Sequence, residues 1–292
     1  MPIAVIAFDF DPLLRLGDGL VVRWQTVALA AVIAAGLMLA GLMARRASLR
    51  PDDLLYVAVG AVPGAVIGGR LGQLATVPEA FSTGPLSVLD ASIGGLELGL
   101  GVVGGVLTGA YVGKLLGAPV GRWALVLAVP VLLVLGGGKL AMSVGGSGQG
   151  SLLDAAWSTA YLGPGPWGSL APELPSHPAQ LYEAIGCLIL ALIVAALARG
   201  QGTAGGQGGR VLLVVVGAWA AMRAGVSVTW RDPTVLGPLP AAGVLAAGIA
   251  AGSVVVLVAV VLWSHRRERT RSSRAAGDDE PAWPDPETRP QF

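Results

Sequence analysis

Hydrophobic residues occur along this chain in long blocks rather than in the stripes of a helix with one wet face. Seven blocks are long enough to cross a bilayer as α-helices, which requires about 20 apolar residues each. They lie at 25–43, 54–71, 93–113, 123–141, 180–198, 211–229 and 240–263. The last block is the clearest, because no Asp, Glu, Lys or Arg occurs between Asp232 and Arg266. The pattern predicts an all-α polytopic membrane protein with about seven transmembrane helices.

Basic residues mark alternate linkers between these blocks. They follow the first, third, fifth and seventh blocks, as Arg45, Arg46, Arg50, Lys114, Arg122, Arg199, Arg210, Arg266, Arg267, Arg269, Arg271 and Arg274. The intervening loops at 72–90 and 142–179 contain no Lys or Arg. By the positive-inside rule, the N-terminus is outside and the C-terminus is cytoplasmic, with Arg15 and Arg231 as minor exceptions.

Composition agrees with a membrane protein and limits its chemistry. The chain is 54% hydrophobic and only 13% charged, whereas soluble domains carry about 25% charged residues. We expect a transmembrane domain at 1–264 and a disordered cytoplasmic tail at 265–292 that is first basic, then acidic and proline-rich. With only His177, His265 and the single Cys187, we expect no metal site. The tail arginines suggest orientation or contact with anionic lipid, not a nucleic-acid surface.

The most informative string is His177-Pro178-Ala179-Gln180-Leu181-Tyr182-Glu183, at the start of the fifth block. A histidine, an amide, a phenol and a carboxylate at the entrance to hydrocarbon each cost free energy unless they have partners. The string therefore indicates a functional region.

Other ionisable residues fall at similar heights. Counting about 1.5 Å per helical residue, the basic and acidic groups all lie in the outer half of the membrane: Arg70, Lys139, Arg223, Arg231, Glu97, His177 and Glu183. Snorkelling to the headgroups could account for Arg70, Lys139 and Arg231. It accounts poorly for Arg223, just past the midplane. The alternative is a cationic pocket, open to the outer surface, that holds an anionic phosphate.

These residues resemble motifs of the bacterial prolipoprotein diacylglyceryl transferases. His177 to Glu183 is similar to that family's His-Pro-x-Gln-Leu-Tyr-Glu string. Further similar segments are Gly68-Gly69-Arg70-Leu71-Gly72, Gly94-Gly95-Leu96 with Gly101-Val102-Val103-Gly104-Gly105, and Arg223 followed by Arg231-Asp232-Pro233. The resemblance extends over most of residues 20–263.

The resemblance implies an enzyme of the bacterial cytoplasmic membrane that uses no cofactor. It would transfer diacylglyceryl from phosphatidylglycerol to the lipobox cysteine thiol of a prolipoprotein, releasing glycerol phosphate. Its partners would be phosphatidylglycerol, the signal-peptide lipobox and membrane lipids. Arg223 and Lys139 would hold the donor phosphate, and His177 or Glu97 would accept the thiol proton. The remaining residues assigned to substrate binding are Arg70, Arg231, Gln180, Tyr182, Glu183 and Gly150.

The chain departs from the family pattern at five positions. Lys139 replaces an arginine and loses its bidentate fork. Met142 replaces an asparagine and Ser147 a glutamate, which predicts the loss of a hydrogen-bond network. Gly99 stands where the family has histidine, and Gln25 where it has tyrosine.

Several alternatives stay open at this point. His177 could anchor the outer loop by a structural hydrogen bond, Glu97 could only pair with a basic neighbour, and Tyr182 could only be an interfacial anchor. A member that has lost transfer would be a lipid- or lipopeptide-binding membrane protein. A transporter is a third possibility, although the odd number of spans and the lack of an inverted repeat argue against it.

Overall fold

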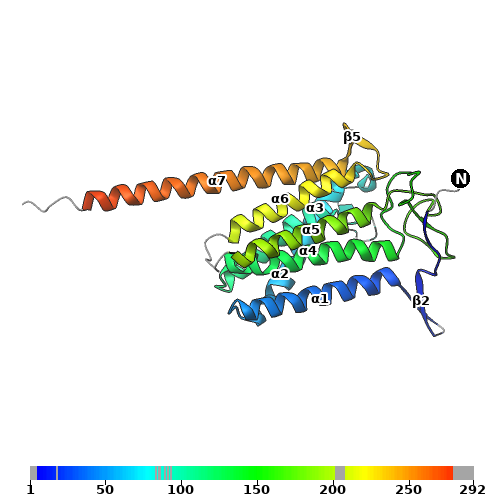
Figure 1. Ribbon diagram of the computed structural model, residues 1–292, viewed down its shortest axis with the longest axis horizontal. Coiled ribbons are helices and arrows are strands. Elements are labelled where there is room, and N and C mark those ends of the chain that lie inside the picture. The colour runs from blue at the N-terminus through cyan, green and yellow to red at the C-terminus, as the bar shows by residue number, and fades with distance from the viewer. Residues whose placement is uncertain are drawn as a thin grey trace, which may run out of the picture.

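The computed structural model describes residues 5–17, 19–82, 84, 87–88, 90, 92, 94–200 and 208–278 of the 292-residue chain. Its helices are α1 (Trp24–Arg46), α2 (Pro51–Thr76), α3 (Leu98–Leu115), α4 (Val120–Val144), α5 (Ala179–Gly200), α6 (Gly208–Ser227) and α7 (Ala241–Asp278). These helices lie side by side as a bundle (Figure 1). All seven are long and apolar enough to cross a membrane, so the predicted all-α, multi-pass architecture is confirmed.

The third helix begins later than the sequence pattern predicted. We expected the span from residue 93, but α3 starts at Leu98. Gly94 has φ +65°, which a helix cannot contain, and the Glu97 side chain caps the first turn. Glycine and leucine before the cap made the apolar block look longer than the helix.

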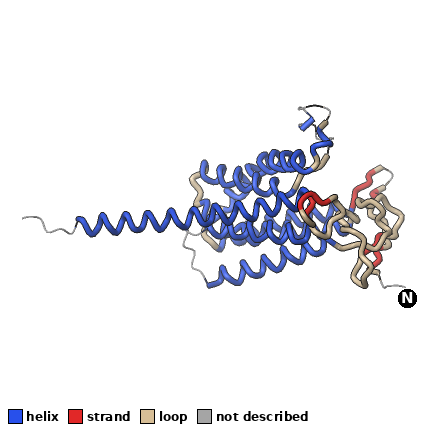
Figure 2. The backbone as a smooth tube through the Cα atoms, turned by 90° about the horizontal axis from the view of Figure 1, so that it is seen from above, coloured by secondary structure: helices blue, strands red, loops and turns tan. Residues whose placement is uncertain are grey.

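Six short strands in the described part of the chain lie at one end of the bundle. They are β1 (Ile6–Phe8), β2 (Leu13–Leu16), β3 (Leu20–Arg23), β4 (Thr159–Tyr161), β5 (Thr234–Leu236) and β6 (Leu239–Pro240). The strand pairs β2–β3 and β5–β6 are hairpins, whereas β1 pairs in parallel with β4. The N-terminal segment is therefore tied to the long loop after α4, and Phe8 stacks on Tyr161 with ring centroids 4.8 Å apart. The loops and strands cluster at this end (Figure 2). We call residues 5–16 and 145–178 the cap, and this end of the bundle the capped end.

The opposite end holds the predicted basic linkers and a compact apolar core. This core contains Ala40, Ala44, Leu49, Leu54, Trp123 and Val126. Small alanines on α1 let the Trp123 indole pack closely, and the Arg122 guanidinium donates to the carbonyl oxygen of Ala47 in the α1–α2 linker. Apolar burial therefore fixes α1, α2 and α4 to one another at this end.

Helices α2 and α3 form a tight hairpin of their own. A methyl group at Gly64 would overlap the carbonyl oxygen of Gly104, and one at Gly104 would overlap that of Gly64. Glycine at both positions therefore allows backbone-to-backbone contact, as expected for packing in lipid. Contacts from this hairpin to α1, α4 and α7 are sparse by comparison. A separate 3-10 helix, η1 (Pro78–Phe81), follows α2.

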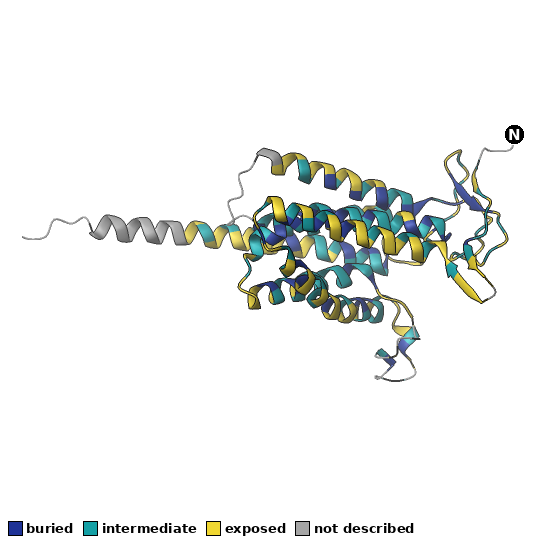
Figure 3. Ribbon diagram, turned by 90° about the horizontal axis from the view of Figure 1, so that it is seen from below, coloured by how far each residue is buried: buried dark blue, intermediate teal, exposed yellow. Residues whose placement is uncertain are grey.

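The outer faces of the helices carry exposed apolar side chains, as a lipid-facing surface requires (Figure 3). The seventh helix continues to Asp278, across the boundary predicted at residue 264. Residues 265–278 are therefore helical rather than irregular, because no proline or glycine interrupts this stretch before Gly277. Residues 279–292 of the predicted tail lie outside the described residues, and the division into domain and tail stays a prediction.

Candidate active site

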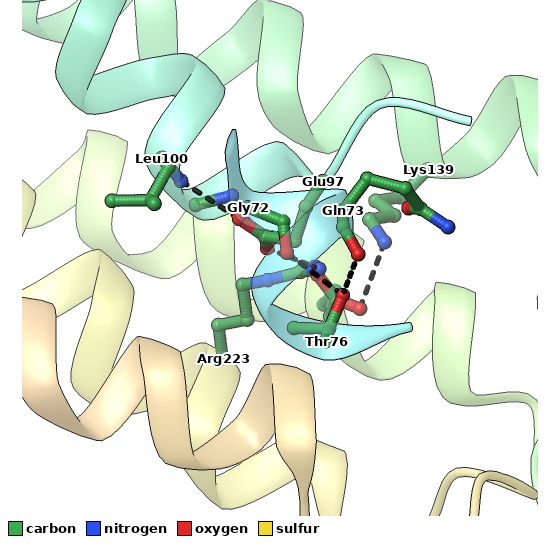
Figure 4. Close-up of polar contacts among 9 residues, drawn as sticks. Gly72, Gln73, Thr76, Glu97, Leu100, Lys139 and Arg223 are labelled. Carbon is green, nitrogen blue, oxygen red and sulfur yellow. Dashed lines mark hydrogen bonds and ion pairs between the residues drawn. The ribbon is translucent and has the colours of Figure 1, made fainter. Parts of the chain in front are cut away.

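Arg223, Lys139 and Glu183 meet near the capped end, each from a different helix. The Arg223 Nη1 of α6 donates to Glu183 Oε2 at 2.8 Å. The Lys139 Nζ of α4 donates to Glu183 Oε1 at 2.9 Å. Glu183 lies near the start of α5 and is the last residue of the informative string. In Figure 4 the side chains of Arg223 and Lys139 reach toward the same point.

A fourth charged group joins this cluster from α3. Glu97 Oε1 lies 3.6 Å from Arg223 Nη2. Both carboxylate oxygens of Glu97 also accept backbone hydrogen bonds, from Gly99 at 2.7 Å and from Leu100 at 2.8 Å. The carboxylate thus caps α3 and neutralises the positive end of its dipole. We call Arg223, Lys139, Glu183 and Glu97 the charge cluster.

The charge cluster is electrically balanced, which corrects the sequence-based expectation of a cationic pocket. Two basic side chains face two acidic ones. Arg223, Glu183 and Glu97 are buried, and the side chain of Lys139 is 12% exposed. Removing one partner of such a buried group leaves an uncompensated charge and costs about 3–5 kcal/mol. The pairing also explains Arg223 better than snorkelling does.

Arg223 nevertheless keeps donors available. A guanidinium has five N–H donors, and its hydrogen bond to Glu183 uses Nη1. Nε is buried with no hydrogen-bond partner among the described residues, and Nη2 is beyond hydrogen-bond distance of Glu97. The Trp230 ring covers one face of the guanidinium, 4.7 Å from its carbon, which limits competing water. Such a fork fits a phosphate.

An apolar cavity of about 590 Å³ lies between α2–α3 and α1, α4 and α6, and it reaches the charge cluster at Glu97, the one member of the cluster that lines it. Glu97 lines one end, while Leu54 and Trp123 line the other. Among the described residues that form its wall, Glu97 is the one with a charged side chain. The volume is within the range of about 300–1,000 Å³ typical of ligand cavities. A polar end joined to a long apolar space suits an amphiphile.

His177 and Tyr182 form a hydrogen-bonded pair at the capped end. His177 Nδ1 lies 3.3 Å from the Tyr182 hydroxyl, which also accepts from Trp157 Nε1 at 3.1 Å. Both His177 and Tyr182 are half-buried. The histidine therefore remains within reach of a substrate, whereas the Glu97 oxygens are already occupied.

Gln180 faces the cap rather than the charge cluster. Its Nε2 donates to the Tyr161 hydroxyl at 3.0 Å, and its buried Oε1 has no hydrogen-bond partner among the described residues. Burial raises the pKa of Tyr161 to about 12, although the Gln180 hydrogen bond opposes that shift. The phenol therefore stays protonated and holds the cap against α5.

Arg231 and Gly150 organise the cap backbone. Arg231 donates to the carbonyl oxygen of Gly150 at 2.6 Å, to that of Leu170, and to the Ser176 hydroxyl at 2.6 Å. Gly150 N donates to the His177 carbonyl at 2.7 Å, and a side chain at position 150 would overlap the Thr229 carbonyl. These contacts position His177.

Arg70 serves the segment that joins α2 to α3. It donates to the carbonyl oxygens of Val88 at 2.8 Å and Asp90 at 2.5 Å, and its guanidinium lies 5.2 Å from the Phe81 ring centroid. These contacts close the connection before Glu97, and the assignment of Arg70 to substrate binding stays a prediction.

Two of the five departures from the family pattern, Ser147 and Gln25, contact each other, and the surroundings of two more, Met142 and Gly99, are tightly packed. Ser147 Oγ donates to Gln25 Oε1 at 2.9 Å, so a hydrogen bond remains where we expected the loss of a network. The methyl carbon of Met142 would lie 2.9 Å from a side chain at Gly148. At Gly99, a Cβ would lie 2.9 Å from Ile249 Cδ1.

Sequence analysis missed the aromatic residues around the site. Trp230, Trp157 and Tyr161 contact Arg223, Tyr182 and Gln180. Trp230 follows soon after Arg223 in the sequence and was a usable signal, because an indole ring can cover a guanidinium group. The other two lie in the cap, where contacts depend on the loop conformation. No cluster of three or more metal-ligating side chains occurs in the described part of the chain.

Comparison with known proteins gives one consistent result. A family profile described as prolipoprotein diacylglyceryl transferase matches residues 12–264. Relatives named phosphatidylglycerol–prolipoprotein diacylglyceryl transferase include one from Methylocella silvestris, 32% identical over 216 residues, which are 68% of this chain and 75% of the relative. One from Nostoc is 24% identical over 276 residues, 92% of this chain and 94% of the relative.

A third relative with the same name, from Geobacter sulfurreducens, is 32% identical over 165 residues. This match covers 55% of the chain and spans 60% of the relative. The family match includes all four members of the charge cluster and the part of the cap from residue 145 to 178.

Proposed function

The chain belongs to the prolipoprotein diacylglyceryl transferase family, and we propose how its residues carry out the transfer. It is a multi-pass membrane transferase that moves a diacylglyceryl group from phosphatidylglycerol to a prolipoprotein. We assign it to the bacterial cytoplasmic membrane with the capped end outside, because the basic linkers lie at the opposite end. The acceptor in this proposal is the lipobox cysteine thiol.

The donor phosphate binds at Arg223. The observation that carries this assignment is a buried guanidinium that Glu183 holds at 2.8 Å while Nε has no hydrogen-bond partner among the described residues. Lys139 contacts the other oxygen of the same carboxylate at 2.9 Å and adds a second positive charge. Glu183 thus fixes both cations at one place, and phosphate oxygens can share them.

The acyl chains occupy the apolar cavity. It meets the charge cluster at Glu97 and runs to Leu54 and Trp123. A lipid with its phosphate at Arg223 can therefore keep its tails away from water without leaving the protein. This placement also brings the glyceryl carbon that carries the phosphate ester to the boundary between cluster and cavity.

The thiol step begins with removal of a proton. His177 is the proposed acceptor, because its imidazole is half-buried and its Nδ1 is held by the Tyr182 hydroxyl at 3.3 Å. The sulfur attacks the glyceryl carbon, so an S–C bond forms and the C–O bond to phosphate breaks. The electron pair stays on the phosphate oxygen, and glycerol phosphate leaves.

Arg223 and Lys139 stabilise the negative charge that develops on the leaving phosphate. Their fixed positions in a largely water-free site make this stabilisation effective. Gln180, Tyr182 and Arg231 keep the cap and His177 in position above the donor. Gly150 allows the close backbone contact that this arrangement needs.

The experiment uses purified full-length protein in vesicles. We expect diacylglyceryl transfer to a lipobox peptide when the vesicles contain phosphatidylglycerol, with equimolar release of glycerol phosphate. Vesicles of phosphatidylethanolamine alone and a peptide with serine in place of the cysteine are the controls. Absence of peptide modification by a folded protein would contradict the proposed function.

A further inference from the structure

We propose that Glu97 is a built-in competitor of the donor phosphate. Its carboxylate occupies the free side of Arg223 in the resting enzyme, is displaced when the donor binds, and returns to expel glycerol phosphate. This inference rests on the proposed function of Arg223 as the phosphate site. It makes Glu97 a residue that sets donor and product affinity, not the thiol base.

The two carboxylates hold Arg223 unequally. Glu183 accepts a hydrogen bond from Nη1 at 2.8 Å, whereas Glu97 lies 3.6 Å from Nη2. The Glu97 oxygens have their short contacts with backbone N–H groups of α3 instead, at 2.7 and 2.8 Å. Of the two acids, Glu97 is therefore the one that an incoming anion can replace on Arg223.

Charge balance requires such a replacement. The resting cluster has two positive and two negative side chains, all largely buried. Adding a phosphate anion would leave an excess negative charge in a region of low dielectric, where repulsion is strong. Moving Glu97 away from Arg223 reduces that repulsion and frees Nη2 for a phosphate oxygen.

Glu97 can move because of where it sits. It precedes α3, whose contacts to α4 and α7 are sparse, while α2 and α3 pack tightly on each other. Glu97 N donates to the Gly69 carbonyl at 2.9 Å, and its side chain packs on Gly72 (Figure 4). The first turn of α3 and the end of α2 therefore form one unit that can shift relative to Arg223.

Such a shift also affects the cavity. Glu97 and Leu98 line its polar end, and Leu54 and Trp123 line the other. The apolar core around Trp123 fixes the hairpin at that far end. Displacement of Glu97 would thus widen the mouth of the cavity while its base stays in place.

The test is Glu97→Gln. The amide oxygen can still accept a hydrogen bond from the first turn of α3, but the competing charge is gone. We expect the KM for phosphatidylglycerol to fall about tenfold, because the binding free energy gained is close to that of one charge-assisted hydrogen bond. The inhibition constant of added glycerol phosphate should fall by a similar factor. The kcat should change by a smaller factor than KM, and any change should be a decrease caused by slower product release.

Two further variants separate competition from a structural effect. Glu97→Asp keeps the charge and the cap, but its shorter side chain reaches less far toward Arg223. We therefore expect both the KM for phosphatidylglycerol and the inhibition constant of glycerol phosphate to fall, but less than in Glu97→Gln. Glu79→Gln removes an exposed carboxylate from η1 and should leave both affinities unchanged. If Glu97 were only a helix cap, Glu97→Gln would lower the Tm without tightening either ligand.

A binding measurement keeps this inference separate from the proposed function. Titration of glycerol phosphate into purified wild-type and Glu97→Gln protein requires no turnover. Tighter binding by the variant supports the competitor role even if transfer is not detected. Unchanged or weaker binding of glycerol phosphate by folded Glu97→Gln overturns the competitor role of Glu97. That result would leave the proposed transferase function unaffected.

Discussion

The two ends of the bundle are held together by different interactions. At the end opposite the cap, α1, α2 and α4 meet through alanines, Leu54 and the Trp123 indole. At the capped end, α4, α5, α6 and the start of α3 meet through four charged side chains, three of them buried. The same helices thus change from apolar packing to ion pairing along their length.

This difference indicates where stability and function reside. Buried apolar area contributes directly to folding, whereas a buried ion-pair group contributes little net stability compared with well-packed apolar residues. Stability alone therefore gives no reason to keep Arg223 and Glu183 inside the membrane. A reaction that releases a phosphate from a lipid does give one.

The largest expected effect is on stability at the apolar end. Trp123→Ala removes a large side chain that is 3% exposed and should lower the free energy of unfolding by about 3–5 kcal/mol. Denaturation of the purified protein measures the loss. Because Trp123 also lines the base of the cavity, the matched readout is kcat with a short-chain donor, which should stay within about twofold in the folded fraction. A selective loss of kcat with that donor would break the division between the two ends.

The next effect is on catalysis at the capped end. Arg223→Ala should lower kcat by about 10²–10³-fold, as for loss of a key oxyanion donor. Transfer to a lipobox peptide measures it. Because the substitution leaves Glu183 and Glu97 without this partner, Arg223→Lys is the matched variant: it should retain the fold and part of the activity. Full activity in Arg223→Ala would contradict the phosphate site.

A smaller effect is expected where the cavity connects the two ends. Val102 lines the cavity, and Val102→Trp would fill part of it. The KM for long-chain phosphatidylglycerol should rise about tenfold, because the donor would lose the contacts of one or two methylene groups. A short-chain donor should be affected less. Leu107→Trp on the exposed face of the same helix is the control, and equal effects of both variants would argue against acyl-chain binding there.

The smallest effect concerns the departure at Lys139. Lys139→Arg keeps the charge next to Glu183 and adds a planar fork, so we expect kcat/KM to change by less than about threefold. Steady-state transfer rates give the comparison. A change of more than tenfold would show that the lysine has a role which its charge alone does not provide.

The sequence predicted the helices well because each span is a local pattern of about 20 apolar residues. It also identified Arg223 as a buried charge in need of a partner. It raised the pairing of Glu97 with a basic neighbour as an alternative. It could not predict that Glu183 and Glu97 together balance Arg223 and Lys139, because that arrangement depends on how four separate segments are placed around one another. The excess of positive charge that we expected came from counting residues by depth alone.

The loops were less predictable for the same physical reason. Arg70 and Arg231 bind backbone carbonyls of the α2–α3 connection and of the cap, and nothing in a sequence reveals which carbonyls a loop will present. The parallel pairing of β1 with β4 joins residues about 150 positions apart. Glu97 was a missed signal, since an acidic residue before an apolar run can mark a helix start, yet we predicted the span from residue 93.

A structure of the full-length protein with bound phosphatidylglycerol tests the central claim most directly. We predict that the phosphate lies in hydrogen-bond contact with Arg223, close to Lys139, that Glu97 has moved away from Nη2, and that the acyl chains fill the cavity toward Trp123. A phosphate bound elsewhere, with Arg223 still enclosed by both carboxylates and the cavity unfilled, would contradict the account.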